Sequence, residues 1–505
     1  QGYKLRYTKK QQYLSDFFEL LLTTGLKQES GQFFTPVPVA QFVIKSLPID
    51  NIIKEKLQNG EKGEYLPYVI DYAAGSGHFL TETMHEVQRI IDNNEFPDVK
   101  AEVKRFIKQA KEFHFDWAFD YVYGIEKDYR LVKVGKVGCY LHGDGLANVI
   151  HSDGLANFEH KDYKGKLALK DKNFEQENKQ FDIIVSNPPY SVSAFRNAAR
   201  QFYKEGDFEL YNKLTDNSSE IECLFIERTK QLLKDGGVAG IILPDSILDN
   251  DSEIVINSRK IIFENFEIIS IVEFGTNVFM ATDVKTKVLF LRRRNNYESI
   301  NLKIAVEKFF TDFQDVTLNG IEKPVNKYVN HVWGGISLDD YLTLLKMAPN
   351  KYILDHEIFL EYKKKIKSRN EKEFWNFIIK SESDKLFYFI LTYPQRIVLV
   401  KSGKKEIEKQ FLGYEFSGRR TKEGIHPIKG KNIEDCTKLF DPNKFDNREK
   451  ASTYIYEAFN KNLDLEIHND LTDHIEYVNL VDLLNFRTSS FDLKVGKTEK
   501  ININY

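Results

Sequence analysis

The chain has 505 residues, of which 42% are hydrophobic, and this is more than one core can hold, so two or three domains are predicted. Lys and Arg (72) nearly balance Asp and Glu (75), and the net charge of -3 excludes nucleic-acid binding through overall charge alone. The three cysteines form no CxxC pair and no run approaches the roughly 20 apolar residues of a membrane span, so we expect a cytoplasmic protein without a disulfide framework, metal site or membrane segment.

Residues 1–30 have the spacing of an amphipathic helix and are predicted to end an N-terminal helical region. From about 65 to 295, short Val/Ile-rich runs alternate with longer helical stretches. The predicted strands are 68–71, 121–126, 148–151, 181–185 and 238–243. This alternation is typical of a doubly wound α/β fold, in which helices cover both faces of a mostly parallel sheet. Two further runs, 268–274 and 287–291, predict a hairpin at the sheet edge.

After residue 295 the sequence becomes rich in lysine and aromatic residues with helical spacing, including 352–370 and 371–389. We place a domain boundary near 296–330, because Gly320, Pro324, Gly334 and Gly335 collect in and just after this stretch. The predicted domains are therefore an α/β domain over 31–295, a mainly helical domain over 296–400, and a polar C-terminal arm or docking segment over 401–505.

The segment DYAAGSGHFL joins a strand ending at Asp71 to a helix that begins near His78. The turn between them consists of small residues, which let a ligand lie against the backbone at the carboxyl end of a strand. The residues of this predicted cofactor site are Asp71, Ala73, Ala74, Gly75, Ser76 and Gly77. A nucleoside-bearing cofactor fits such a turn; the structural alternative is a glycine turn that only packs a helix on a strand.

Two acidic residues follow later strands. Glu126 ends the second strand, where a carboxylate can accept both hydroxyls of a ribose, although an exposed loop carboxylate is the alternative. The repeat DGLAN then occurs twice, beginning at Asp144 and at Asp153. Because 148–152 is β-prone, Asp153 stands at a strand end and is the predicted contact to the cofactor adenine, with Asp144 as the alternative.

The segment SNPPY follows the apolar run 181–185, and its residues Asn187, Pro188, Pro189 and Tyr190 form the predicted catalytic loop. Proline has no N–H, so this turn lacks donors and offers acceptors. The Asn187 side-chain oxygen and the Pro188 carbonyl can accept the two protons of a planar amine, which makes its nitrogen nucleophilic without a general base at the attack step. Tyr190 can stack on the base that carries the amine.

These motifs resemble the class I S-adenosylmethionine-dependent methyltransferases, whose sheet has seven strands, and more narrowly the N6-adenine DNA methyltransferases. GQFFTPVPVAQFV (31–43) resembles a segment of type I restriction-modification methylase subunits and of related fused restriction enzymes. GGVAGIILPDSIL (236–248) and VFMATDVKTKVLFL (278–291) resemble later motifs of the same family. The resemblance implies that the methionine end of the cofactor is covered by Gln32, Phe33, Phe34, Thr35 and Pro36. It also implies that Phe279, rather than Phe274, contacts the target base; the alternative is that Phe279 only closes the hairpin.

The resemblance implies transfer of a methyl group from S-adenosylmethionine to adenine N6 in double-stranded DNA, as the modification component of a restriction-modification system. No repeated strand pattern of a DNA-reading module follows the catalytic region, so a specificity subunit or a fused target-recognition domain is expected, and a restriction subunit is a further expected partner. Only 30 residues precede Gly31, where family subunits carry a larger helical domain, so part of the protein is expected to be missing or on another chain. The alternatives are methylation of guanine N2 in RNA or of a protein glutamine amide, and a non-catalytic module that binds cofactor or DNA.

Overall fold

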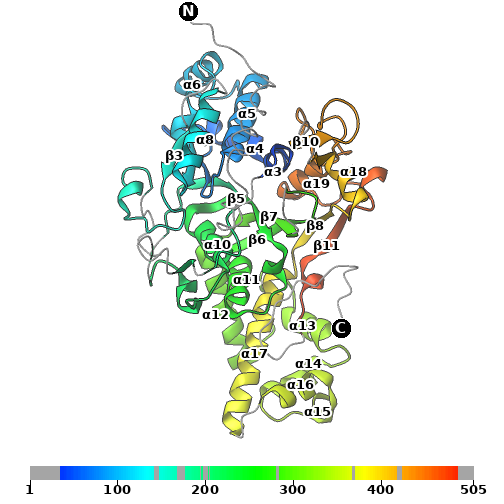
Figure 1. Cartoon of the computed structure of the whole chain (residues 1–505). Helices are drawn as coiled ribbons and strands as arrows, with labels where there is room; N and C mark the ends of the chain where they lie inside the picture. Colours follow the sequence, from blue (N-terminus) through cyan, green and yellow to red (C-terminus); the bar gives the residue numbers. More distant parts are fainter. Residues whose placement is uncertain are drawn as a thin grey trace, which may run out of the picture. The chain divides into compact units, whose positions relative to one another are not determined.

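The computed structural model describes residues 35–141, 147–167, 177–193, 195–196, 203, 205–279, 284–366, 370–417 and 424–486 (Figure 1). The chain divides into two compact units. The first is formed from Gln1–Asp245, Ile268–Arg293 and Val398–Tyr477, and the second from Ser246–Glu267, Arg294–Ile397 and Val478–Tyr505.

A nine-stranded sheet forms the centre of the first unit, in the order β11-β8-β6-β7-β5-β4-β1-β2-β3. The strands are β1 (Val69–Asp71), β2 (Val122–Glu126), β3 (Asn148–His151), β4 (Phe181–Ser186), β5 (Leu233–Pro244), β6 (Phe266–Phe274), β7 (Thr286–Arg293), β8 (Arg396–Lys401) and β11 (Ile475–Asn479). Strands β3, β2, β1, β4 and β5 are parallel, and β7 runs antiparallel to β5. The predicted doubly wound, mostly parallel fold is confirmed, and the seven strands β1 to β7 are extended by β8 and β11.

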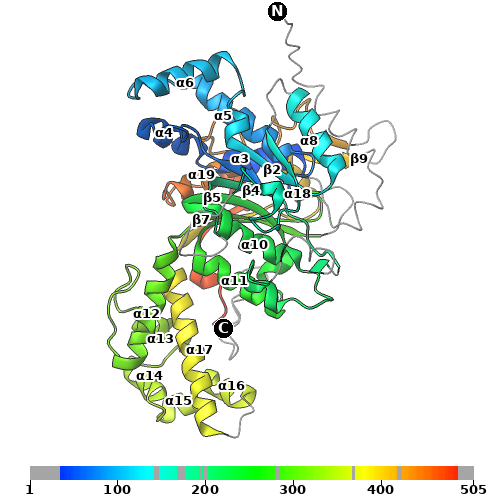
Figure 2. The ribbon, with the colours of Figure 1, turned by 90° about the vertical axis from the view of Figure 1, so that its left-hand side faces the viewer.

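Helices cover both faces of this sheet. Those of the first unit are α3 (Val37–Ser46), α4 (Ile49–Asn59), α5 (His78–Asn93), α6 (Ala101–Glu112), α7 (Ala118–Tyr121), α8 (Tyr129–Leu141), α10 (Ile221–Leu232), α18 (Glu406–Leu412) and α19 (Ala451–Phe459), with short 3-10 turns at Lys161–Tyr163, Glu209–Lys213 and Asn469–Leu471. Helices α3 and α5 lie on one side of the sheet and α10 on the other (Figure 2). Because β1, β2 and β3 are parallel and in register, their carboxyl ends meet at one edge, where the predicted residues Asp71, Glu126 and Asp153 stand.

The C-terminal region differs from the predicted polar arm, because Val398–Tyr477 belongs to the same compact unit as the sheet. The apolar run 397–400 is buried, and β8 pairs in parallel with β6, so the hairpin of β6 and β7 is not at the sheet edge. A second, two-stranded sheet follows, formed by β9 (Tyr414–Ser417) and β10 (Gly424–Pro427). A buried β-branched run needs a partner strand, and here the sheet supplies it.

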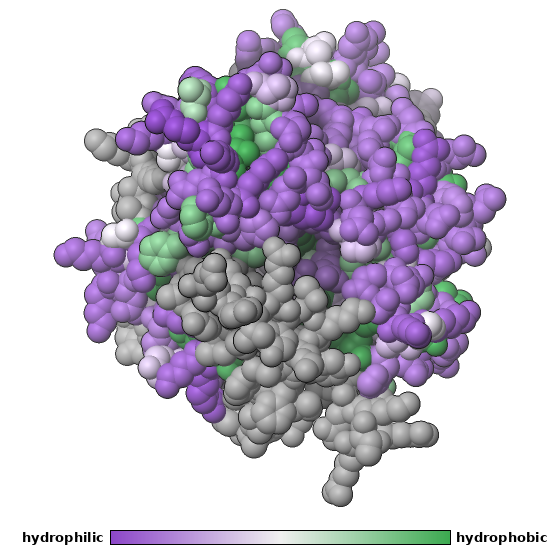
Figure 3. Space-filling view, turned by 90° about the horizontal axis from the view of Figure 1, so that it is seen from above, coloured by the Kyte–Doolittle hydropathy of each residue, from purple (hydrophilic) through white to green (hydrophobic). Residues whose placement is uncertain are grey.

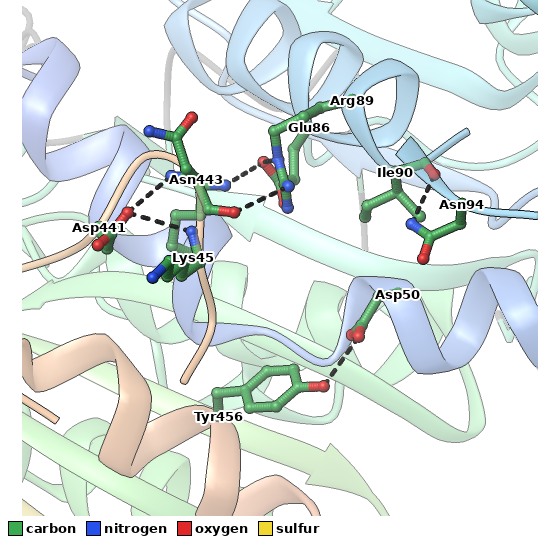
Figure 4. Close-up of polar contacts among 10 residues, drawn as sticks. Lys45, Asp50, Glu86, Arg89, Ile90, Asn94, Asp441, Asn443 and Tyr456 are labelled. Atoms are coloured by element: carbon green, nitrogen blue, oxygen red, sulfur yellow. Dashed lines mark hydrogen bonds and ion pairs between the residues drawn. The ribbon is translucent and has the colours of Figure 1, made fainter. Parts of the chain in front are cut away.

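Polar contacts fix this returning segment to the helices near the N-terminal end of the described chain (Figure 4). Tyr456 on α19 donates a hydrogen bond to Asp50 on α4 over 2.9 Å. Arg89 on α5 donates to the backbone oxygen of Asn443 over 3.0 Å and also pairs with Glu86. The described part of 398–477 is therefore an integral part of the first unit.

The second unit is mainly helical, as predicted for 296–400. Its elements are the 3-10 turn Asp245–Leu248, α11 (Glu253–Asn265), α12 (Asn296–Asp312), α13 (Pro324–Val332), α14 (Leu338–Leu345), α15 (Lys351–Asp355), α16 (Glu357–Lys365), α17 (Glu371–Thr392) and the turn Leu480–Leu483. The predicted helix over 352–370 is broken at His356, whose side chain caps α16. Helix α11 also belongs to this unit, although it lies within the predicted α/β domain, 31–295.

One buried carboxylate organises the second unit. Glu382 on α17 is fully buried. Its two carboxylate oxygens accept hydrogen bonds from the side chains of Tyr328, Trp333, Tyr341, Tyr362 and Lys385. These donors come from α13, α14, α16 and α17 and from the residue that follows α13. Because the hydrogen bonds and the Lys385 charge favour the ionised form, the pKa of Glu382 is lowered in spite of its burial. This network fixes the packing of the helices around α17.

The surface seen from above is mainly hydrophilic, and its hydrophobic residues form small separate groups (Figure 3). In the part of the chain that the structure describes, no helix combines the length and apolar character needed to cross a membrane.

Candidate active site

A cavity of about 260 Å³ opens where the carboxyl ends of β1, β2 and β4 meet. Its wall is formed by five groups of residues. They are Thr35, the turn Asp71–Ser76 with His78 and Phe79, the segment Ile125–Lys127 with Leu131, the pair Asp153 and Gly154, and a last group of Asn187, Pro189, Val192, Ile221 and Phe225. The four strand-end segments predicted separately from the sequence, after β1, β2, β3 and β4, thus contribute residues to one cavity.

The turn after β1 is built by its glycines and by Asp71. Gly75 and Gly77 have φ angles of 53° and 89°, a region that side chains disfavour. The Asp71 carboxylate is 1% exposed and accepts hydrogen bonds from Ser186 Oγ over 2.6 Å and from the Ala73 amide over 3.0 Å. Burial raises the pKa of Asp71 to about 7 against these hydrogen bonds, and the nearby Glu126 carboxylate adds to the rise. Asp71 therefore ties the turn to the end of β4.

Glu126, at the end of β2, connects the turn to the next strand. One carboxylate oxygen accepts a hydrogen bond from the Gly75 amide over 2.9 Å, and the other accepts from the Asp128 amide over 2.7 Å. The side chain is buried, and burial raises its pKa above the usual range. A buried carboxylate that also lines a cavity favours ligands with donor groups, such as hydroxyls or amines.

Asp153 follows β3 and lines the same cavity. Its carboxylate accepts hydrogen bonds from Lys127 Nζ over 2.8 Å and from the Leu155 amide over 2.9 Å. A Cβ atom at Gly154 would lie only 2.2 Å from the Tyr72 carbonyl oxygen, so the close approach of this loop to the end of β1 requires glycine. Asp144, the alternative copy, lies outside the described residues.

Two residues that the sequence analysis did not identify support the Asp153 loop. Arg228 on α10 is buried and donates hydrogen bonds to the Leu155 and Ala156 carbonyls, both over 2.9 Å. The Tyr163 hydroxyl donates to the Asp153 carbonyl. An arginine within a helix and a tyrosine in a polar loop carry no local signal of this role, because the contacts join positions about 70 and 10 residues apart.

The predicted catalytic loop lies at the end of β4, beside the cavity. The Asn187 amide donates from Nδ2 to Thr35 Oγ1 over 3.2 Å, and the Thr35 carbonyl is 2.8 Å from His78 Nδ1. Asn187 and Pro189 line the cavity, but Pro188 and Tyr190 do not and are buried. Tyr190 is 2% exposed, so its ring packs inside the protein and presents no open face in this structure.

The segment predicted to cover the methionine end of the cofactor is described only in part. Thr35 reaches the cavity, and Pro36 immediately precedes α3 as expected for a helix start. Gln32, Phe33 and Phe34 lie outside the described residues.

Phe279 is 3% exposed and belongs to the hydrophobic core together with Phe274. It does not line the cavity. This burial fits the alternative interpretation, in which Phe279 closes the hairpin, and the base contact that the resemblance implies stays a prediction.

The strand order and a ligand cavity at the carboxyl ends of β1 and β2 define the class I methyltransferase architecture. A family model described as N-6 DNA Methylase matches residues 9–374, and the chain belongs to this family. The family resemblance read from the sequence motifs is thereby confirmed.

Curated relatives and solved structures are similar over part of their length. The type II restriction enzyme and methyltransferase RM.Eco57I of Escherichia coli is 27% identical over 45% of this chain and 24% of its own. The methylase subunit of the Salmonella potsdam type I restriction enzyme StySPI is 24% identical over 56% of this chain and 45% of its own. The chain thus spans less than half of these relatives. A modification subunit of a putative type I restriction enzyme from Vibrio vulnificus covers 56% of this chain, and this chain covers 49% of it, at 20% identity and a TM-score of 0.37.

Proposed function

We propose that this chain binds S-adenosylmethionine and transfers its methyl group to the N6 amine of adenine in DNA. One observation carries the proposal: the glycine turn after β1, the Glu126 carboxylate and the Asn187 side chain line a single cavity in a member of the N-6 DNA methylase family. A parallel sheet brings such turns to one edge, and here they leave a cavity between them that polar groups line, which is the arrangement expected of a ligand site.

The cavity lining fits the proposed cofactor. The turn Gly75–Gly77 allows close approach of a ligand to the backbone, and Glu126 and Asp153 offer carboxylate oxygens suited to ribose hydroxyls and to the adenine amine. Thr35 and Asp71 would hold the methionine end. When bound, S-adenosylmethionine supplies an electrophilic methyl group.

The catalytic loop would act by orienting the target amine. The Asn187 Nδ2 donor is engaged by Thr35, which turns the amide so that Oδ1 is the atom suited to accept a proton of the amine. The Pro188 carbonyl would accept the second proton, and the nitrogen lone pair would then face the cavity. The protein would contribute by positioning the amine in line with the methyl group, as an in-line displacement requires.

Calorimetric titration with S-adenosylmethionine and mass spectrometry of digested DNA together test this proposal. Glu126→Ala should weaken cofactor binding, whereas Asn187→Ala should leave it nearly intact and lower N6-methyladenine formation by orders of magnitude. Asn94→Ala removes an amide that donates to the Ile90 carbonyl on α5, away from the cavity, and serves as the matched control. Unchanged affinity in Glu126→Ala, or methylation by Asn187→Ala within tenfold of wild type, would contradict the assignment.

The proposal extends to the system in which the enzyme acts and to its partner subunits. The similarity to type I methylase subunits supports a site-specific adenine methyltransferase of a cytoplasmic restriction-modification system, which acts on double-stranded DNA with a specificity subunit or a fused recognition domain and with a restriction subunit. Methyl groups found on guanine N2 of RNA or on a protein glutamine amide, in place of DNA adenine, would favour the alternative substrates.

A further inference from the structure

Helix α10 places a buried carboxylate against the turn that follows the catalytic loop. Glu222 is 3% exposed, and its Oε2 atom accepts a hydrogen bond from the Ser191 amide over 3.1 Å. Ser191 directly follows Tyr190 and has a φ angle of 57°, a left-handed conformation that residues other than glycine rarely adopt. Such a conformation persists when surrounding contacts enforce it, and Glu222 provides one of them.

The same helix also forms part of the cavity wall. Ile221 and Phe225, four residues apart and therefore on one side of α10, line the cavity. Glu222 lies between them in sequence and contacts the turn after Tyr190. One rigid element thus shapes the wall and holds the end of the catalytic loop.

We propose that Glu222 is a positioning residue for methyl transfer: by accepting the Ser191 amide it fixes the turn that holds Asn187 and Pro188 in place. The inference rests on the proposed function. Neither Glu222 nor Ser191 was singled out by the sequence motifs. The residue acts through the loop and is not itself required to touch the substrate.

The chemical requirement is an acceptor oxygen in a buried position. Burial raises the pKa of Glu222 to about 7, and the Glu220 carboxylate adds to the rise. Near neutral pH the side chain is therefore partly protonated, and its carbonyl oxygen can accept the Ser191 amide in either state. Glutamine keeps such an oxygen, whereas alanine does not.

The experiment compares Glu222→Gln and Glu222→Ala with a matched control on the same helix. Glu227 is also buried, and it accepts the backbone amides of Glu209 and Leu210, away from the catalytic loop. Glu227→Ala therefore removes an equivalent carboxylate–amide contact without loosening the Ser191 turn. The readouts are kcat and KM for DNA methylation per folded protein, S-adenosylmethionine affinity by calorimetry, and amide hydrogen exchange of the peptide that contains residues 186–193.

The proposal predicts that Glu222→Ala lowers kcat at least tenfold and speeds exchange at the turn, with cofactor affinity within threefold of wild type. Glu222→Gln should restore most of the activity and protection, and Glu227→Ala should change neither. Equal kcat and equal exchange in Glu222→Ala and Glu227→Ala, with only their melting temperatures lowered, would overturn the positioning role. If the wild type itself forms no N6-methyladenine, the proposed function fails, while the exchange experiment still decides whether Glu222 holds the turn.

Discussion

The substitution Asp71→Asn tests the electrostatics at the centre of the candidate site. Asp71 is 1% exposed, and burial raises its pKa to about 7 from the usual 3.8. A pKa raised by about 3 corresponds to roughly 4 kcal/mol of preference for the protonated form in the folded state, at about 1.4 kcal/mol for each pH unit. This value is an upper bound, because local rearrangement and water reduce the penalty.

The sign follows from proton linkage. The folded protein binds the Asp71 proton more tightly than the unfolded chain does, so this contribution to stability is fully present below pH 3.8 and is lost as the pH rises through about 7. Asparagine stays neutral at every pH and keeps an oxygen that can accept from Ser186 and Ala73. The stability of Asp71→Asn relative to wild type should therefore increase from pH 5 to pH 8.

Melting temperatures of both proteins across pH 5 to 8 measure this difference. A change of a few kcal/mol corresponds to a relative shift of several degrees in a domain of this size. The buried carboxyl groups of Glu222 and Glu227 titrate in both proteins, so their effects cancel in the comparison. A difference in melting temperature that is the same at pH 5 and pH 8 would refute the reasoning.

Three further changes follow from the packing. Gly154→Ala should weaken S-adenosylmethionine binding measured by calorimetry, because the new Cβ would lie 2.2 Å from the Tyr72 carbonyl oxygen and push the Asp153 loop away; unchanged affinity would contradict this. Glu382→Gln should destabilise the protein by about 3–5 kcal/mol in a denaturant titration, since buried Lys385 loses its counter-charge. If that unpaired charge is the cause, the double variant Glu382→Gln with Lys385→Met should recover part of the lost stability. Phe279→Ala should cost about 3–5 kcal/mol of stability, because the ring is 3% exposed, whereas an unchanged melting temperature with weaker binding of a 2-aminopurine DNA probe would instead support the base contact.

The strands and the loops at their ends were predictable because each carries a local signal. Runs such as 181–185 alternate with helical stretches, and Gly75 and Gly77 mark a turn that needs positive φ angles. The sequence therefore indicated the strands β1 to β5 and residues after β1, β2, β3 and β4 that line the cavity.

The contacts that depend on distant parts of the chain were not predictable in the same way. The run 397–400 has the composition of a strand, but its pairing with β6 joins positions more than 120 residues apart and was missed. Glu222 reaches Ser191 across 31 residues, and its helix also carries Glu227, which looks the same in sequence. Burial of Tyr190 and Phe279 likewise depends on the three-dimensional packing around them, since aromatic residues near a site suit either a core or a base contact.

The most direct test of the central claim is a mass-spectrometric measurement of N6-methyl-2′-deoxyadenosine in DNA. DNA from a host without adenine methylation is incubated with isotope-labelled S-adenosylmethionine and the full-length gene product, together with any specificity chain it requires. The account predicts labelled N6-methyladenine with wild-type protein and its loss with Asn187→Ala, while calorimetry shows that this variant still binds the cofactor. Bound cofactor with no label on DNA adenine, or equal labelling by wild type and Asn187→Ala, would contradict it.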